Sequence, residues 1–243
     1  MPKDSIKVKI KNQRLRINKN MKKNITLEDV RSDPQVDEYI KRSTEFLRLY
    51  HYTDHGIDHS NLVSERARYL AKEIGLSEKE QELVSIASYV HDMGNFLDRK
   101  NHEYWGALMF HSIFQERLPA EDMATIMQAI ATHDNYRAQI VNAVAAVGMI
   151  ADKSDVRRSR VIEKDKAQIA RDIHNRVNFA ATNNRFEANK ETKKITLTLK
   201  IDTSFVPVME YFEIFTYRMV QCRKAAQFLG YKFELVINDF KLL

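Results

Sequence analysis

Apolar residues recur at spacings of three and four along most of the chain from Thr26 to Asp152, which is the repeat of an amphipathic helix. Gly75 is expected to end one helix, and Ser77 with Glu80 forms a capping box for the next. We predict a short helix after Thr26 and further helices over residues 34–49 and 58–74, from Ser77 into SIASYVHDMG (85–94), and over residues 103–117, 120–133 and 139–152. Short connections of this kind are typical of a compact helical domain, so the central part is expected to be all-α.

The last third of the chain has a mixed pattern. The run KITLTLKI (194–201) alternates apolar and polar residues, which predicts a strand with residues 178–187 as its hairpin partner. A helix from Pro207 to Gly230 and a final strand over 231–237 give a small α+β unit of ββαβ order. We therefore expect a mainly α chain with three parts: a basic arm (1–27), a helical domain (28–165) and an α+β unit (166–243).

Basic residues are concentrated at the N-terminus. The first 24 residues hold nine Lys or Arg and one acid, Asp4, so they carry +8 while the whole chain carries +6 and the remainder is slightly acidic. Such an arm either contacts nucleic acid or another polyanion, or is simply solvated. Ile6, Val8 and Ile10 alternate with lysines, which favours a strand that pairs with the C-terminal sheet.

Composition excludes several classes of protein. The single cysteine, Cys222, cannot form an internal disulfide, and no apolar run approaches the roughly 18 to 20 residues of a membrane span. The first residues lack the apolar segment of a secretory signal. We expect a cytoplasmic protein that does not associate with membranes, and the oligomeric state stays open, a homodimer included.

Histidines and carboxylates gather at the ends of the predicted helices. Six of the eight histidines lie between residues 51 and 111, and the notable segments are HGIDH (55–59), HDMG (91–94), His102, His133-Asp134 and ADK (151–153). Imidazole and carboxylate groups bind divalent metals, and ligands from several helices can enclose an ion in the core of a bundle. The sequence therefore predicts a metal site built from helix ends.

The order of these segments resembles a known family. His59, then His91-Asp92, then Asp152 within ADKSD resemble the H…HD…D pattern of the HD superfamily of metal-dependent phosphohydrolases, over roughly residues 50 to 160. HEYWGA at His102 and AIATHD at His133 are similar to the additional histidines of HD subfamilies that bind two ions. These subfamilies include hydrolases of symmetrical dinucleoside tetraphosphates.

The resemblance implies a helical bundle that binds one or two divalent ions, either Mn, Fe, Co, Ni or Zn, with Mg also compatible. It implies that the ligands of the first ion are His59, His91, Asp92 and Asp152. His102 and His133 would complete a second site, with Asp92 bridging the two ions. A hydroxide activated by the metal would then cleave a phosphomonoester, phosphodiester or phosphoanhydride of a small, nucleotide-like substrate.

Several neighbouring residues are candidates for supporting roles. Helical offsets place Lys153, Arg157 and Arg160 on one face after Asp152, and we expect these residues to contact phosphate, with a solvated face as the alternative. The expected catalytic residues are Asp92, Lys153 and Arg157. His111 competes with His102 for its place in the metal site, and Asp134 is expected to cap the helix end or orient His133. His55 and Asp58 either contact substrate or support the ligands and the loop.

The sequence departs from the family pattern at one position, and it is compatible with two functions other than phosphate hydrolysis. Asn95 stands where the family commonly has a lysine after HDxG, so a basic substrate contact is missing there. The same six ligands would permit a di-iron oxygenase. A third hypothesis is a module that binds nucleic acid or a protein partner through the basic arm and has only a structural metal.

Overall fold

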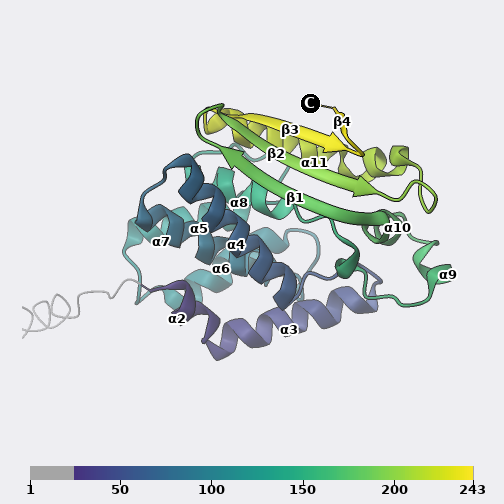
Figure 1. The fold of residues 1–243 in the computed structure, drawn as a ribbon. Helices are drawn as coiled ribbons and strands as arrows, with labels where there is room; N and C mark the ends of the chain where they lie inside the picture. Colours follow the sequence, from purple (N-terminus) through teal and green to yellow (C-terminus); the bar gives the residue numbers. More distant parts are fainter. Residues whose placement is uncertain (1–24, 243) are drawn as a thin grey trace, which may run out of the picture.

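A computed structural model describes residues 25–242, and the first 24 residues of the basic arm, with the predicted strand, lie outside the described residues. Helices α4, α5, α7 and α8 pack against one another, and α6 packs on α7 (Figure 1). The helices of this part are α2 (Leu27–Arg31), α3 (Pro34–Leu49), α4 (Ile57–Ile74), α5 (Glu78–Val90), α6 (His102–Phe114), α7 (Ala120–Thr132) and α8 (Ala143–Lys153).

Local sequence signals set most of the helix ends. Ser77 and Glu80 form the predicted capping box, and Gly75 ends α4 in the left-handed conformation with φ 85°. The predicted start of α8 at Gln139 is wrong, because the Asn142 side chain accepts a hydrogen bond from Ala145 N at 2.8 Å and caps the helix there.

The predicted helical continuation after Asp152 is also wrong. Helix α8 ends at Lys153, and only a short 3-10 turn follows at Arg158–Arg160. Arg160 O accepts a hydrogen bond from Asp54 N at 2.7 Å, and the Arg160 guanidinium donates to Asp54 O at 2.9 Å and to Asp155 O at 3.0 Å. These contacts with the loop before α4 draw the chain out of the helix, so Lys153, Arg157 and Arg160 do not share a helical face.

The C-terminal part contains the predicted ββαβ order. Strand β2 pairs antiparallel with β1 and parallel with β3, and a short strand that was not predicted, β4, pairs antiparallel with β3. Because of this sheet, an all-α description holds for the central part and is wrong for the whole chain. The elements are α9 (Lys166–Ile169), α10 (Ile173–Ala180), β1 (Ala181–Asn189), β2 (Lys194–Ile201), α11 (Val208–Phe228), β3 (Lys232–Ile237) and β4 (Phe240–Lys241).

Helix α11 joins the two parts of the molecule. It is the crossover between the parallel strands β2 and β3, and it packs against both β3 and α8 (Figure 1). Alternate residues of β2 are buried, as the period of two predicted. A single hydrophobic cluster therefore extends from the helical part through α11 into the sheet, and α11 can place side chains beside the ends of the bundle helices.

Cys222 provides a test of this packing. It lies in the buried stripe of α11, and burial raises the pKa of its thiol to about 12. The reactive thiolate is therefore scarce until the pH approaches that value. We expect Ellman's reagent at pH 8 to modify the unfolded chain fully and the native chain hardly at all. Rapid modification of the native protein would contradict the described position of α11.

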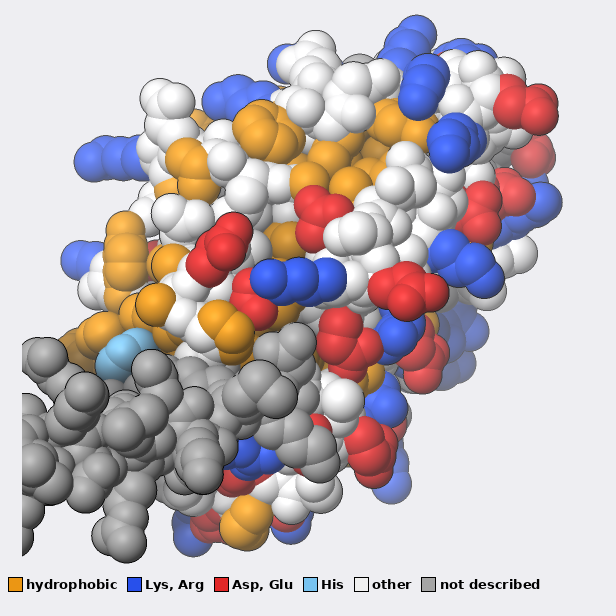
Figure 2. All heavy atoms as spheres, turned by 90° about the vertical axis from the view of Figure 1, so that its left-hand side faces the viewer, with side chains coloured by type: hydrophobic (Ala, Val, Ile, Leu, Met, Phe, Trp, Pro, Cys, Tyr) orange, Lys and Arg blue, Asp and Glu red, His pale blue; other side chains and the backbone are white. Residues whose placement is uncertain are grey.

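The distribution of charge on the surface and the hydropathy of the helices are relevant to association with other molecules. Figure 2 shows one face of the molecule, on which basic and acidic side chains lie among one another without a continuous field of either sign. Among residues 25–242, no helix is long and apolar enough to cross a membrane.

Candidate metal centre

Helix ends bring the six predicted ligands together. His59 lies in the first turn of α4, His102 begins α6, and Asp152 lies at the end of α8. His91 and His133 are the C-cap residues of α5 and α7, and Asp92 follows directly after His91. The histidines and Asp92 are at most 4 % exposed, so these polar groups face one another in the interior of the bundle.

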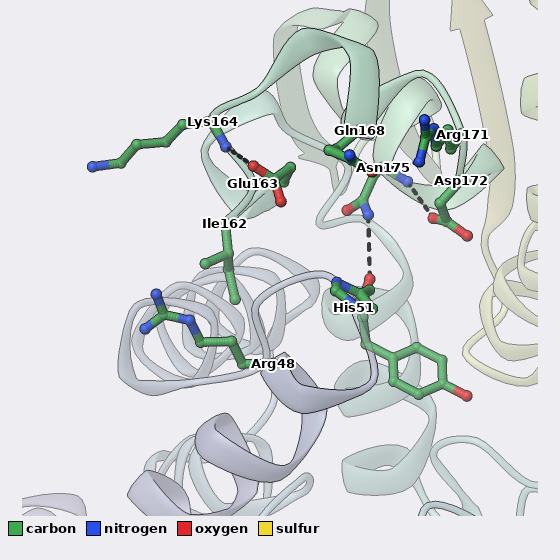
Figure 3. Close-up of a pocket in the computed structure, with 10 residues that line it drawn as sticks. Arg48, His51, Ile162, Glu163, Lys164, Gln168, Arg171, Asp172 and Asn175 are labelled. Atoms are coloured by element: carbon green, nitrogen blue, oxygen red, sulfur yellow. Dashed lines mark hydrogen bonds between the residues drawn. The ribbon is translucent and has the colours of Figure 1, made fainter.

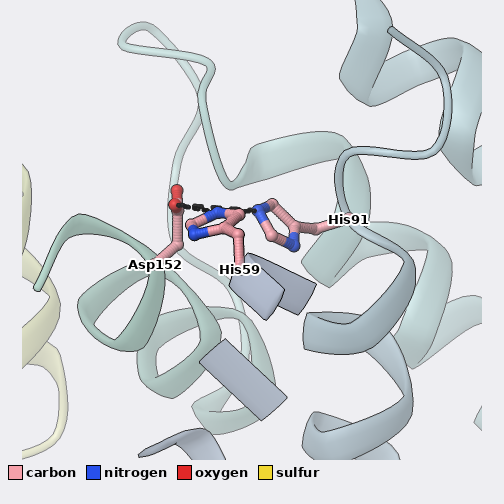
Figure 4. Close-up of side chains that lie close together, drawn as sticks. All are labelled: His59, His91 and Asp152. Carbon is pink, nitrogen blue, oxygen red and sulfur yellow. Dashed lines mark hydrogen bonds and ion pairs between the residues drawn. The ribbon is translucent and has the colours of Figure 1, made fainter. Parts of the chain in front are cut away.

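The first group consists of His59, His91, Asp92 and Asp152. The two imidazole Nε2 atoms lie 3.2 Å apart, and Asp152 Oδ1 lies 3.4 Å from His59 Nε2 and 3.6 Å from His91 Nε2 (Figure 4). Asp92 Oδ2 lies 3.6 Å and 3.2 Å from the same two nitrogens. Ligands that share one ion at about 2.0 to 2.2 Å lie roughly 3 to 3.5 Å apart, so these separations fit a common ion.

The second group uses the other oxygen of Asp92. His102 Nε2 and His133 Nε2 lie 3.1 Å apart, and Asp92 Oδ1 lies 3.1 Å from the first and 3.7 Å from the second. Arg99 Nη1 is 3.2 Å from His102 Nε2, so this side chain would have to move when an ion binds there. The carboxylate of Asp92 thus lies between two pairs of imidazoles.

The tautomers of the histidines follow from their outer hydrogen bonds. The Nδ1 atoms of His91, His102 and His133 lie 2.7 Å, 3.0 Å and 2.7 Å from the backbone oxygens of Ser88, Arg99 and Ile130. A carbonyl oxygen only accepts, so each Nδ1 carries a proton, and each Nε2 presents a lone pair when the ring is in the neutral form that binds a metal. His59 Nδ1 likewise donates to the Asp155 carboxylate, at 2.7 Å. In their neutral forms the two rings of each group therefore turn their Nε2 lone pairs toward each other, an arrangement that a cation between them stabilises.

The charges around the cluster also favour a cation. Burial lowers the pKa of His91, but the carboxylates of Asp92 and Asp152 outweigh burial and raise it to about 10. Burial raises the pKa of the Asp92 carboxyl, but the neighbouring imidazoles, His91 first, hold it well below its usual value. The site therefore stabilises positive charge among ionised carboxylates, and its donor set of imidazole and carboxylate groups suits a divalent transition metal.

Lys153 and Asp134 form a pair beside this cluster. The Lys153 ammonium donates to Asp134 Oδ1 at 2.7 Å and to Asp152 Oδ2 at 2.8 Å, and its side chain is 3 % exposed. Burial lowers the pKa of Lys153, but the two carboxylates outweigh burial and raise it above its usual value. The structure does not show Asp134 orienting the His133 ring, because His133 Nδ1 donates to Ile130 O.

The other residues singled out in the sequence lie outside the two groups of proposed ligands. His111 and Asp58 are exposed, and neither belongs to the two groups. His55 is buried, donates from Nδ1 to Thr53 O at 2.6 Å, and lines the small cavity beside Asp92. The Arg157 guanidinium donates from Nε to Asp155 Oδ1 at 2.8 Å and from Nη1 to Ser159 Oγ at 3.1 Å; its direct contact with phosphate stays a prediction.

Sequence reasoning missed the supporting positions of Asp155, Arg99 and Arg218. Asp155 accepts from His59 Nδ1 at 2.7 Å, although its only signal in the sequence was its place in the motif ADKSD. Asn95 donates to Asp92 Oδ1 at 2.9 Å and accepts from Arg99 at 2.7 Å, so Arg99 supplies a cation near the position where the family commonly has lysine. Arg218 of α11 also lines the cavity beside Asp92, and nothing in the sequence relates this helix to the motifs.

The outer partner of His59 gives a testable prediction. The Asp155 carboxylate holds the proton on His59 Nδ1, and it also offsets the buried charge of Arg160, whose Nε lies 3.7 Å away. We expect Asp155→Asn to weaken metal binding by about 10- to 100-fold, because outer hydrogen bonds orient a ligating imidazole and raise its basicity. Competition with a chromophoric chelator measures the affinity, and Asp58→Asn on the exposed start of α4 is the control. Equal affinity in both variants would contradict this role.

A separate cavity is lined by residues that follow the bundle helix α3 and by the segment that contains α9. It measures about 590 Å³ and is lined by the end of α3, by α9 and by the start of α10, where Asn175 Nδ2 donates to His51 O at 3.2 Å (Figure 3). Tyr52 lines this cavity, and its ring faces the Arg99 guanidinium at 6.0 Å. Tyr52 is thus a contact between this cavity and Arg99, and none of the proposed metal ligands lines the cavity.

Comparison with known proteins agrees with this geometry. Residues 56–157 match the model of the HD domain family, a range that includes all six clustered residues. No curated protein matches the chain.

Proposed function

We propose, from the match of residues 56–157 to the HD domain family, whose members are generally metal-dependent phosphohydrolases, that the chain hydrolyses a phosphate ester or anhydride of a small, nucleotide-like substrate. The observation that supports the proposal most strongly is the pair of facing imidazole lone pairs on either side of Asp92. A structural metal site needs one closed set of ligands, whereas two adjacent sets that share a carboxylate are typical of centres that act on phosphate.

The proposed ligands of the first ion are His59, His91, Asp92 and Asp152. His102, His133 and the other oxygen of Asp92 are the proposed ligands of a second ion. When bound, such ions would lower the pKa of water and withdraw charge from phosphoryl oxygens. The donor set admits Mn, Fe, Co, Ni or Zn.

The chain's own residues orient this centre. The Nδ1–H groups donate to fixed acceptors and thereby aim each Nε2 inward. Lys153 holds Asp152 between the first group and the cavity, where its ammonium also attracts an anionic substrate. The role of Lys153 in the reaction is thus to position a ligand and to compensate the charge of the phosphate.

The division into parts and the partners are also proposals. We regard residues 28–165 as the catalytic unit and 166–243 as a unit that packs on it through α11. Contact of the basic arm with a polyanion stays a prediction, because residues 1–24 lie outside the described part of the chain.

A panel of substrates tests the proposed function. Metal-loaded protein is incubated with phosphomonoesters, nucleotides and dinucleoside polyphosphates, and released phosphate and consumed oxygen are measured together. We expect phosphate release that a chelator stops, without oxygen uptake. Oxygen uptake with iron and no phosphate release would instead support the di-iron oxygenase hypothesis.

A further inference from the structure

Arg218 has an unusual environment for an arginine on a packed helix. It projects from α11, and its guanidinium lies over the ring of Phe215, with 4.9 Å between Cζ and the ring centroid. Phe215 is itself buried and stacks on Tyr211 at 4.9 Å, so the ring is a rigid support. Within residues 25–242, no hydrogen bond or ion pair reaches the Arg218 guanidinium.

Arg160 offers a second donor without a partner. Its side chain is 2 % exposed, Nε donates to Asp54 O, and Nη1 donates to Asp155 O. Nη2 is buried and has no hydrogen-bond partner in the described part of the chain. An unsatisfied buried donor of a charged group costs free energy, so this N–H group is expected to bind an acceptor that comes from outside the chain.

The two arginines line the same small cavity as the metal cluster. Its lining includes Arg160 and Arg218 together with the proposed ligands Asp92, His133 and Asp152. The cavity measures about 10 Å³, enough for about one water molecule. A phosphate would therefore have to displace a side chain at the opening. The partly exposed Arg218 would give up only its contact with the Phe215 ring when it moves, and no hydrogen bond or ion pair within the described residues.

The charges of the lining indicate the class of ligand. The carboxylates of Asp92, Asp134 and Asp152 face the cations Arg99, Lys153, Arg160 and Arg218. Cations already exceed carboxylates before any metal is added, and each divalent ion increases the excess. The cavity thus suits a group with at least two negative charges better than a monoanion.

We propose that Arg218 and Arg160 together bind the phosphate of the substrate, and that they favour a dianionic phosphate, either a monoester or a terminal phosphate, over a diester. This inference rests on the proposed phosphohydrolase function and makes its substrate class more specific. A terminal phosphate offers three oxygens, enough for two guanidinium groups and a metal centre, whereas a diester offers only two non-bridging oxygens and one charge. The C-terminal unit would then supply a substrate-binding residue to the HD domain.

The experiment compares wild type with Arg218→Ala and Arg218→Lys as full-length, metal-loaded proteins. Calorimetry measures binding of inorganic phosphate, and steady-state kinetics compare p-nitrophenyl phosphate with bis-p-nitrophenyl phosphate. Arg223→Ala, on the exposed side of the same helix, is the control for general effects on α11. Metal content and thermal unfolding show whether each variant keeps the centre and the fold.

We expect Arg218→Ala to weaken phosphate binding about 10-fold or more and to raise KM for the monoester, with unchanged metal content. The preference for monoester over diester should fall, Arg218→Lys should recover part of it, and Arg223→Ala should behave as wild type. Equal phosphate binding by wild type and Arg218→Ala would overturn this inference and leave the proposed function intact. If the wild type neither binds phosphate nor releases it from any substrate, both proposals are wrong.

Discussion

Replacing Asp92 by alanine should abolish turnover and reduce the metal bound per chain. Each carboxylate oxygen of Asp92 faces a different pair of imidazoles, so this single change removes a ligand from both groups. Loss of the ions removes several kcal/mol of transition-state stabilisation, and we expect turnover to fall on the order of 10³-fold or more. Elemental analysis and phosphate release measure the two effects on the same preparation.

Two further variants separate loss of the metal centre from loss of the fold. Asp92→Asn retains the volume of the side chain and a carbonyl ligand, so it should bind metal more tightly than Asp92→Ala does. Its turnover should still be strongly reduced. Asp98→Ala removes an exposed acid close by in the sequence and should behave as wild type. Full metal content and normal turnover in Asp92→Ala would exclude the proposed bridging role.

Gly94→Ala should have the largest effect on stability. A Cβ atom at this position would lie 2.3 Å from His102 O and 2.6 Å from Gly106 N, both backbone atoms that no rotamer change can move aside. The turn after α5 would have to separate from the start of α6, at a cost of about 3 kcal/mol or more. In a domain of this size that lowers Tm by roughly 6 to 12 °C.

The same change should also weaken metal binding, because the segments that would separate contain Asp92 and His102. Gly148→Ala is the matched control: the nearest atoms to its Cβ would be Ser88 Oγ at 3.3 Å and Val84 Cγ2 at 3.8 Å, both in side chains. The control should stay within about 1 kcal/mol of wild type, since the gain in helix propensity offsets the tighter contact. Thermal unfolding followed by circular dichroism compares the two variants. Equal Tm values would show that the turn does not approach α6 as described.

Local patterns explain why so much of the fold could be predicted from the sequence. Helix α3 has the predicted bounds, and the strand β2 has the predicted alternation, because spacing and capping depend on neighbouring residues. The end of α8 could not be predicted in this way. It depends on hydrogen bonds between Arg160 and Asp54, which are far apart in the sequence.

In the candidate site, too, the features that depend on local sequence were predictable and the tertiary contacts were not. The sequence placed the six histidine and aspartate residues at helix ends, and the family resemblance supplied their grouping. The supporting contacts are tertiary: Asp155 reaches His59 from beyond α8, and Arg218 reaches the cavity from α11. Asp134 is predicted to cap the helix end or to orient His133. In the structure His133 Nδ1 donates to Ile130 O, and Asp134 accepts a hydrogen bond from Lys153.

Stepwise addition of metal tests the central claim most directly. Protein stripped with a chelator is titrated with Mn²⁺, and phosphate release from an active substrate is recorded after each addition. The proposed function predicts no turnover without metal and a rise that levels off at about two ions per chain. Turnover by the stripped protein, or no phosphate release at any metal load, would contradict the assignment of this cluster as a phosphohydrolase centre.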